Sequence, residues 1–156
     1  MKMLAPMVAA CALLFASPVL AHEADASEDY RARPLTDEVI YFVLPDRFAN
    51  GDSANDLGGY PADRLASGYD PADKGFYHGG DLKGLTEKLD YIQGMGVTAI
   101  WFAPIFKNKP VQGAPGNESA GYHGYWVTDF TQVDPHFGTN AEFRAFVDAA
   151  HARGMK

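Results

Sequence analysis

The sequence has 156 residues, with 13 lysines and arginines against 20 aspartates and glutamates, so its formal net charge is −7. Apolar residues make up 47% and charged residues 21%, which is ordinary globular composition and excludes disordered and collagen-like proteins. The acidic balance argues against a nucleic-acid-binding protein, and the length allows one domain and little more.

Residues 1–21 have the layout of a secretory signal peptide. Lys2 is the only charge before His22, an apolar run occupies 3–19, and small residues precede a cleavage site after Ala21. An uncleaved membrane anchor and a lipoprotein are the alternatives, but the run is short for a span and is interrupted by prolines. We therefore expect a secreted or periplasmic protein with no stable membrane association after cleavage.

The chain after the signal begins with a polar segment, residues 22–36, that reads as a flexible lead-in. A continuous apolar run at 39–44, closed by proline, predicts a strand that is buried on both faces. Residues 45–80 are rich in Asp, Asn, Gly and Pro and have neither a helical nor a strand period, so they predict a long loop.

A helix and a second strand are expected next. The helix has one apolar face, formed by Leu82, Leu85, Leu89 and Ile92. Gly94 and Gly96 end this helix, and the apolar run at 97–103 predicts a second strand buried on both faces. Residues 104–138 then form a second long loop.

The last segment contains a helix and the start of a third strand. Thr139 and Glu142 have the spacing of a capping box, apolar residues continue the helix to Ala150, and Gly154 lies at its end. Residues 155–156 would begin the strand. Alternating strands and helices predict a parallel α/β architecture, either a β/α barrel or a doubly wound sheet. Both place binding loops at the carboxyl ends of the strands, where the two long loops fall.

The first long loop gathers oxygen-bearing side chains. Four of them lie within seven residues: Asn50, Asp52, Asn55 and Asp56. Calcium prefers carboxylate, amide and carbonyl oxygens, and Gly51 would let the loop turn back so that these oxygens converge. On spacing alone, however, a solvated turn explains the segment better, because these residues are also the usual turn formers. Asp81, after two glycines, is either a helix N-cap or a more distant metal ligand.

The second long loop gathers aromatic side chains. Tyr122, His123, Tyr125 and Trp126 lie within five residues. Flat aromatic rings stack on the apolar faces of sugars, and histidine can hydrogen-bond their hydroxyl groups. Packing of the aromatic side chains beneath the rim of the fold is an equally good explanation of this segment.

These segments, in this order, resemble the alpha-amylase family, glycoside hydrolase family 13, including its cyclodextrin glycosyltransferases. The resemblance is carried by 37–48, 79–85, 94–101 and 121–129, and it covers 37–156. It implies that 37–156 form the N-terminal portion of a (β/α)8 TIM barrel, about two and a half of its βα units.

The resemblance also implies ligands for a calcium ion and for a sugar. The calcium ligands would be Asn50, Asp52, Asn55, Asp56, Gly79 and Asp81. Positions 50 and 52 carry Asn and Asp where related transferases often have the reverse, but the number of oxygens is the same. For the sugar, Tyr125 would stack on the reacting glucose, His123 would hydrogen-bond a hydroxyl group, and Trp126 with Asp129 would hold the loop.

The implied activity is that of a secreted, retaining α-glucan hydrolase acting on the α-1,4 bonds of starch and maltodextrin. In the family, the catalytic carboxylates lie on later strands, so we assign no catalytic residue here and expect the 156-residue chain to be inactive alone. A glucanotransferase, a cyclomaltodextrinase or debranching enzyme, and a non-catalytic sugar-binding relative are the alternatives.

Overall fold

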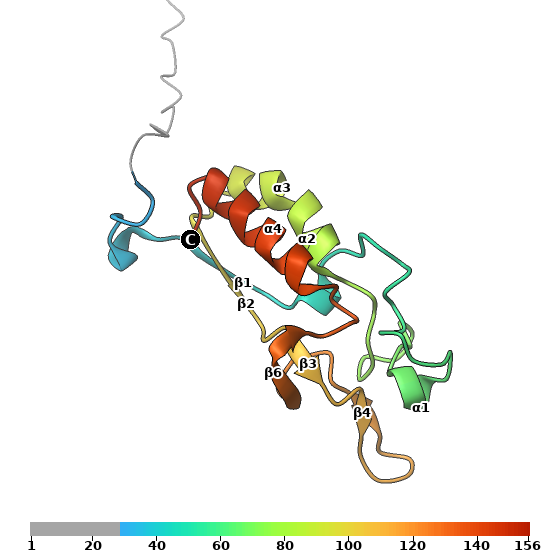
Figure 1. Ribbon diagram of the computed structural model, residues 1–156. Coiled ribbons are helices and arrows are strands. Elements are labelled where there is room, and N and C mark those ends of the chain that lie inside the picture. Colours follow the sequence, from blue (N-terminus) through green and yellow to red (C-terminus); the bar gives the residue numbers. More distant parts are fainter. Residues whose placement is uncertain (1–28) are drawn as a thin grey trace, which may run out of the picture.

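The structure, a computed structural model, describes residues 29–156 (Figure 1). The predicted signal peptide at 1–21 lies outside the described residues. The helices are α1 (Arg64–Ser67), α2 (Leu82–Glu87), α3 (Leu89–Gly94) and α4 (Asn140–Ala152), with 3₁₀ turns at Leu35–Asp37 and Pro45–Arg47. The strands are β1 (Ile40–Val43), β2 (Ala99–Phe102), β3 (Phe106–Asn108), β4 (Val111–Gln112), β5 (Ser119–Ala120) and β6 (Val127–Val133).

The central sheet is parallel, as the alternation of strands and helices predicts. β1 pairs with β2 so that Ile40 lies opposite Ala99. The chain returns beside the other edge of β2, because Lys156 N–H donates to the Thr98 carbonyl at 2.9 Å and Ile100 N–H donates to the Lys156 carbonyl at 2.8 Å. This is parallel pairing at the position where a third strand is predicted to start. Within the described residues the sheet is open and forms no closed barrel.

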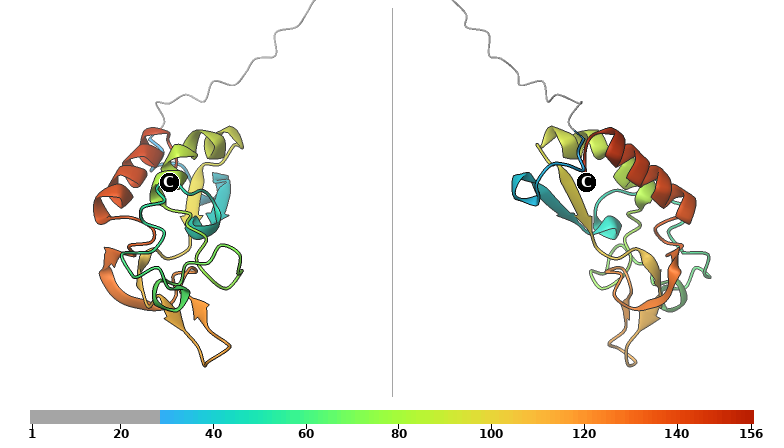
Figure 2. Two further views of the ribbon diagram at one scale, coloured as in Figure 1. Left: turned by 90° about the vertical axis from the view of Figure 1, so that its right-hand side faces the viewer. Right: turned by 60° about the vertical axis from the view of Figure 1, so that its left-hand side comes forward.

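The longer helices cover one face of this sheet (Figures 1 and 2). The predicted apolar face of the first helix is confirmed, because Leu82, Leu85, Leu89 and Ile92 are all almost fully buried. The helix is, however, divided at Lys88 into α2 and α3. The capping box of α4 is confirmed in both directions between Thr139 and Glu142. Between residues 29 and 156 we find no helix whose length and apolar character would carry it across a bilayer.

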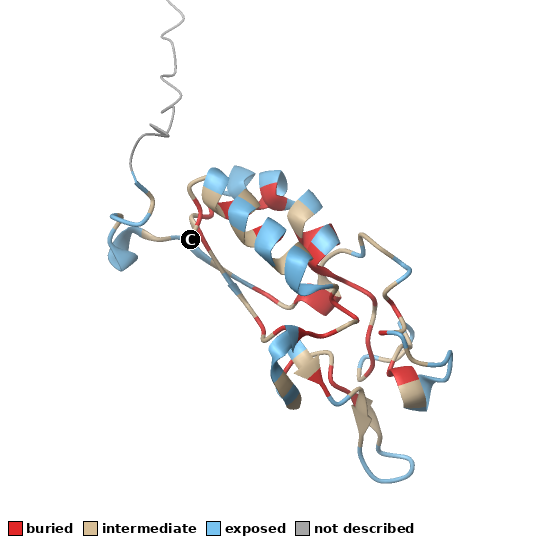
Figure 3. Cartoon of the chain, viewed as in Figure 1, coloured by how far each residue is buried: buried red, intermediate tan, exposed pale blue. Residues whose placement is uncertain are grey.

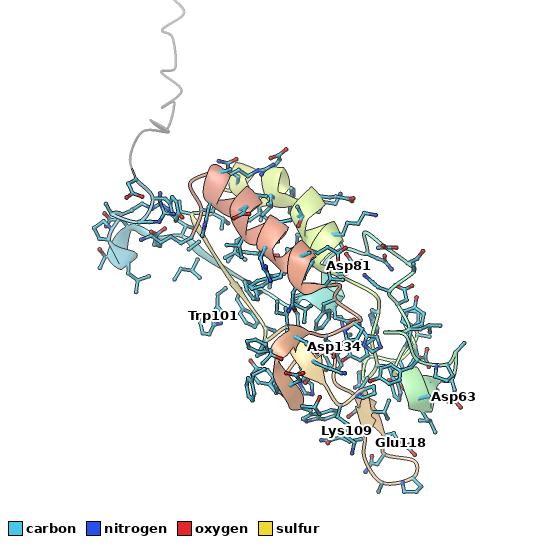
Figure 4. The ribbon with its side chains drawn as sticks, viewed as in Figure 1. Asp63, Asp81, Trp101, Lys109, Glu118 and Asp134 are labelled. Atoms are coloured by element: carbon cyan, nitrogen blue, oxygen red, sulfur yellow. The ribbon has the colours of Figure 1, made fainter. Side chains whose placement is uncertain are left out.

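The prediction that both strands are buried on both faces is wrong for the described part of the chain. Ile40, Phe42 and Trp101 are 50%, 51% and 65% exposed. Trp101 points away from the helices (Figure 4), and its ring meets Phe42 edge to face at 5.5 Å. Exposed residues along β1 are pale blue in Figure 3. The apolar runs are continuous, but among residues 29–156 helices pack on one face alone.

The prediction of two structureless long loops is also wrong in part. The first contains α1 and a bridge between Tyr69 and Tyr77. In the second, β3 pairs antiparallel with β6, and β4 pairs with β5 in a projecting hairpin (Figure 1). β3, β4 and β5 have only two or three residues each, and β6 pairs with β3 with register shifts, so these strands leave no clear period-2 signal in the sequence.

A buried carboxylate joins the amino ends of the strands. Oε1 of Glu38 accepts hydrogen bonds from Arg33 Nε at 3.0 Å and Lys156 Nζ at 2.9 Å. Arg33 also donates to the carbonyls of Thr98 and Gly154. Burial by itself raises the pKa of Glu38, but the hydrogen bonds from Arg33 and Lys156 outweigh it and lower the pKa to about 2.

Glu38→Gln is expected to lower the free energy of unfolding in a pH-dependent way. A carboxylate whose pKa falls on folding stabilises the native state above its unfolded pKa, and this contribution disappears as the pH falls through the folded pKa. The loss in the free energy of unfolding, relative to the parent, should therefore be largest above about pH 4.5 and should shrink as the pH falls toward 2. Urea unfolding across this range measures it, with Asp37→Asn as an exposed control; a gap that does not depend on pH would contradict the assignment.

Candidate functional site

The two long segments, residues 45–80 and 104–138, meet at the carboxyl ends of the parallel strands. Since β1 and β2 are parallel, the segments that follow them leave from the same end (Figure 1). Arg47 connects the two segments. Its guanidinium donates to the carbonyls of Lys74 and Phe76 and lies 4.0 Å from the centre of the Tyr122 ring, a cation–π contact. The first segment therefore holds the aromatic segment in place through Arg47.

Asp46, in the 3₁₀ turn that follows β1, is a structural carboxylate. It is 2% exposed, and Oδ1 accepts the backbone N–H groups of His78 at 2.9 Å and Gly79 at 3.3 Å. Burial raises its pKa, while the His78 hydrogen bond and the charge of Arg47 offset part of that increase. These contacts fix the His78–Gly79 backbone beside the end of β1. A surface pocket here is lined by residues that include Asp46, Asn50 and His78.

Asp81 caps a helix and also holds the preceding loop. It is fully buried, and its Oδ1 accepts the N–H groups of Gly84 at 2.6 Å and Gly51 at 3.1 Å. Its Oδ2 accepts Asp52 N–H at 2.8 Å and Asn55 Nδ2 at 3.1 Å. The N-cap interpretation is therefore confirmed, with Asp81 at the start of α2 (Figure 4). Four donors converge on its carboxylate.

All six residues predicted to bind calcium lie in one cluster. Asn50 Nδ2 donates to Asp56 Oδ1 at 2.7 Å, and a Cβ added to Gly79 would lie 2.6 Å from the same oxygen. Asp52 and Asn55 join the cluster through Asp81. In residues 29–156, no three His, Cys, Asp or Glu side chains are grouped as a metal site. Any cation here would therefore depend on amide and backbone oxygens as well.

The predicted sugar-contacting residues also lie together. Tyr125 N–H donates to His123 Nδ1 at 3.0 Å, and the two rings stack at 5.6 Å. The Trp126 ring is perpendicular to His123 at 4.6 Å. Tyr125 is 65% exposed, whereas partial burial lowers the pKa of His123. The result is a half-buried histidine beside an open tyrosine ring.

Gly124 brings this aromatic loop close to the sheet. It has φ of +80°, and a Cβ there would lie 1.8 Å from the Pro104 carbonyl oxygen, just beyond β2. Only glycine fits such an approach. The expectation that Asp129 holds the loop is wrong, because its carboxylate accepts the N–H and hydroxyl of Thr131 within β6.

Sequence reasoning missed Arg47 and Asn108 as parts of this site. Asn108 Oδ1 accepts the Trp126 N–H at 2.7 Å and so anchors the aromatic loop to β3. Both residues act on partners that are distant in the sequence, so local spacing contains no signal for them. An arginine beside an aspartate, in the turn that follows a predicted strand, is the weak signal that could have identified Arg47.

The fold is that of part of an α/β protein. Its sheet is parallel and has helices on one face, and polar and aromatic loops follow the carboxyl ends of the strands. Residues 42–156 match the family model described as the alpha amylase catalytic domain. The chain therefore belongs to the alpha-amylase family, whose fold is a TIM barrel, although the described residues form only an open part of one.

Three known proteins illustrate the similarity. An alpha-amylase of Streptomyces lividans is 72% identical over 93 residues, which cover 60% of this chain and 10% of that protein. The periplasmic alpha-amylase of Escherichia coli (strain K12) is 43% identical over 75% of this chain and 17% of its own length. The crystal structure of the cyclomaltodextrin glucanotransferase CldA superposes with a TM-score of 0.67 at 50% identity, over 76% of this chain and 24% of its own. This chain thus spans a quarter or less of each of these relatives.

Proposed function

We propose that this chain is part of a longer, exported, retaining α-glucan hydrolase of the alpha-amylase type and contributes one wall of its sugar site. The observation that carries the proposal is the exposed Tyr125 ring beside His123, at the carboxyl edge of the parallel sheet. The names of the similar proteins support a substrate of this class, since two are alpha-amylases.

The two side chains would bind a sugar in complementary ways. The Tyr125 ring would stack on the apolar face of a glucose unit. His123 Nδ1 accepts the Tyr125 N–H, so the neutral ring carries its proton on Nε2 and can donate it to a sugar hydroxyl. Its lowered pKa favours this neutral form at pH 7.

We assign no carboxylate of this chain to the proposed chemistry. Retaining hydrolysis needs two carboxyl groups about 5 Å apart, one of them the nucleophile. Asp46 and Asp81 are buried, and their oxygens accept backbone hydrogen bonds, which leaves neither free to attack a sugar. We therefore expect starch hydrolysis from a longer protein that contains this chain, and none from residues 1–156 alone.

Assaying both proteins on maltoheptaose, with NMR of the first product anomer, tests the proposal. A product that keeps the α configuration supports a retaining hydrolase. Hydrolysis by the 156-residue chain, or inversion at the anomeric carbon, would contradict it. A glucanotransferase is the second candidate, favoured by the likeness to CldA, and cyclic or elongated products in the same assay would identify it. Binding without turnover would indicate a sugar-binding relative.

Export is part of the proposal and is supported by the apolar run before His22 and by the periplasmic relative. The mass of the mature protein tests it, because cleavage after Ala21 leaves His22 as the first residue. A mature protein that retains residues 1–21 would contradict cleavage.

We propose further that the cluster around Asp81 takes up calcium. The fit rests on the Oδ1 atom of Asn55, which is buried and has no hydrogen-bond partner, and on the small space that Gly79 leaves beside Asp56. Carboxylate and amide oxygens are the ligands that calcium prefers. Asn50, Asp52, Asn55, Asp56, Gly79 and Asp81 would hold the ion, which would neutralise charge and stiffen the loop.

Calcium is therefore expected to raise the Tm of the protein by several degrees, and EDTA should remove this gain. Asn55→Ala, which deletes the unpartnered oxygen, should respond less, and magnesium should replace calcium poorly because it needs a smaller octahedral site. Scanning calorimetry with each ion checks this. Equal Tm values in calcium and EDTA would contradict the site.

A further inference from the structure

His136 lies at the centre of a buried polar connection between the two long segments. The residue is 2% exposed, its Nδ1 lies 2.7 Å from Asp134 Oδ1, and its Nε2 lies 2.8 Å from the Ser67 carbonyl oxygen. Both partners are acceptors, so each ring nitrogen of His136 contacts one acceptor. One ring therefore joins the end of α1 to the segment between β6 and α4.

The ring of His136 is held in place by the first long segment. It lies parallel to the Tyr77 ring, with centroids 4.0 Å apart and an angle of 6° between the planes. Tyr60 lies nearly parallel to it at 6.0 Å. A Cβ added to Gly58 would come within 2.3 Å of the ring, so the backbone passes directly over it. The imidazole has little freedom to rotate.

From His136 the connection continues to the proposed sugar site. Asp134 Oδ2 accepts the Asn108 N–H at 2.7 Å, and Asn108 Oδ1 accepts the Trp126 N–H at 2.7 Å. Trp126 in turn packs on His123. Asp134 and Asn108 are almost fully buried. Buried hydrogen bonds of this kind restrict each member to one geometry.

We propose that His136 is a positioning residue that sets the aromatic loop through Asp134 and Asn108. By fixing Asp134 against the first long segment, His136 fixes Asn108, whose Oδ1 atom holds Trp126, and thus the position of the His123 ring. This positioning role depends on the proposed function only in one respect, namely that the positioned loop binds a sugar. The positioning itself can be measured without substrate.

The sequence contains two tryptophans, so Trp101→Phe leaves Trp126 as a single fluorescent reporter. Protonated histidine quenches an adjacent indole, and the His123 ring is 4.6 Å from Trp126, so the emission should report the titration of His123. His123→Gln in the same background should abolish this titration and so identify its source. The other titratable groups that face His123 are Tyr122 and Tyr125. The charged Arg47 guanidinium contacts the Tyr122 ring.

In the single-tryptophan parent, the midpoint of the fluorescence titration should lie below 6.5, the ordinary pKa of histidine, because burial lowers the pKa of His123. His136→Phe keeps the stacking on Tyr77 but removes both hydrogen bonds. It should move the midpoint up toward 6.5 and increase acrylamide quenching of Trp126 about twofold, since the loop opens to water. His136→Asn keeps a donor for Asp134 and should stay closer to the parent.

A folded His136→Phe variant with the midpoint and quenching of the parent would overturn the proposal, even if its Tm is lower. If that variant does not fold, Asp134→Asn replaces it, and the same two outcomes decide. Maltoheptaose titration of each protein separates the two proposals. If a longer protein that contains this chain binds no glucan, while His136→Phe still shifts the midpoint, the proposed function is contradicted and the positioning role is supported.

Discussion

Asp81→Ala is expected to destabilise the protein by about 3–5 kcal/mol, a loss in Tm on the order of 10–20 °C. Four donors, from Gly51, Asp52, Asn55 and Gly84, converge on this carboxylate in a fully buried position. Alanine would leave all four without an acceptor and would also remove the N-cap of α2. An N-cap alone is worth about 1 kcal/mol, and each unsatisfied buried donor adds to that.

Asp63→Ala is the matched control, because Asp63 is also a helix N-cap. It accepts the Leu65 N–H at 2.8 Å but lies exposed on α1 (Figure 4). Its replacement should cost about 1 kcal/mol or less. Calorimetry on both variants, in calcium and in EDTA, separates capping from ion binding. The Asp81 contacts are contacts within the protein, so most of the loss should persist in EDTA. Equal losses in the two variants would contradict the role assigned to Asp81.

The parts of the fold that could be predicted are those with a local signature. The leucines of α2 and α3 repeat at helical spacing, and Thr139 and Glu142 are three residues apart, so both features follow from the sequence. The exposed face with Phe42 and Trp101 could not be foreseen. A continuous apolar run predicts that both faces of a strand are buried, but it does not indicate which elements pack on each face.

The candidate site divides in the same way. Residue type and spacing singled out the two loops, and the family resemblance then grouped the six residues of the Asp81 cluster and the pair His123 and Tyr125. What holds those residues in place was not predictable, because it depends on tertiary contacts such as those of Arg47 with Tyr122 and of Asn108 with Trp126. Asp129 shows the opposite error. The family resemblance implied a supporting role, but Oδ1 of its carboxylate bonds the nearer Thr131.

Tyr125→Ala is expected to separate function from stability. The side chain is 65% exposed, so its loss should change the free energy of unfolding by less than about 0.5 kcal/mol. In a longer protein that hydrolyses α-glucans, the same change should lower kcat/KM roughly tenfold, because the stacking surface for a glucose unit is gone. Tyr125→Phe keeps that surface and should retain most of the activity.

Tyr91→Ala provides the control for Tyr125→Ala. Tyr91 is 61% exposed on α3, a helix on the face of the sheet rather than at its carboxyl edge, so its replacement removes a similar area of exposed ring. Maltoheptaose kinetics and urea unfolding on both variants give the comparison. If Tyr91→Ala and Tyr125→Ala lose the same activity, exposure of aromatic surface explains the effect and the stacking role is wrong. If Tyr125→Ala alone loses activity at unchanged stability, the ring acts on substrate, because no change in folding is left to account for the loss.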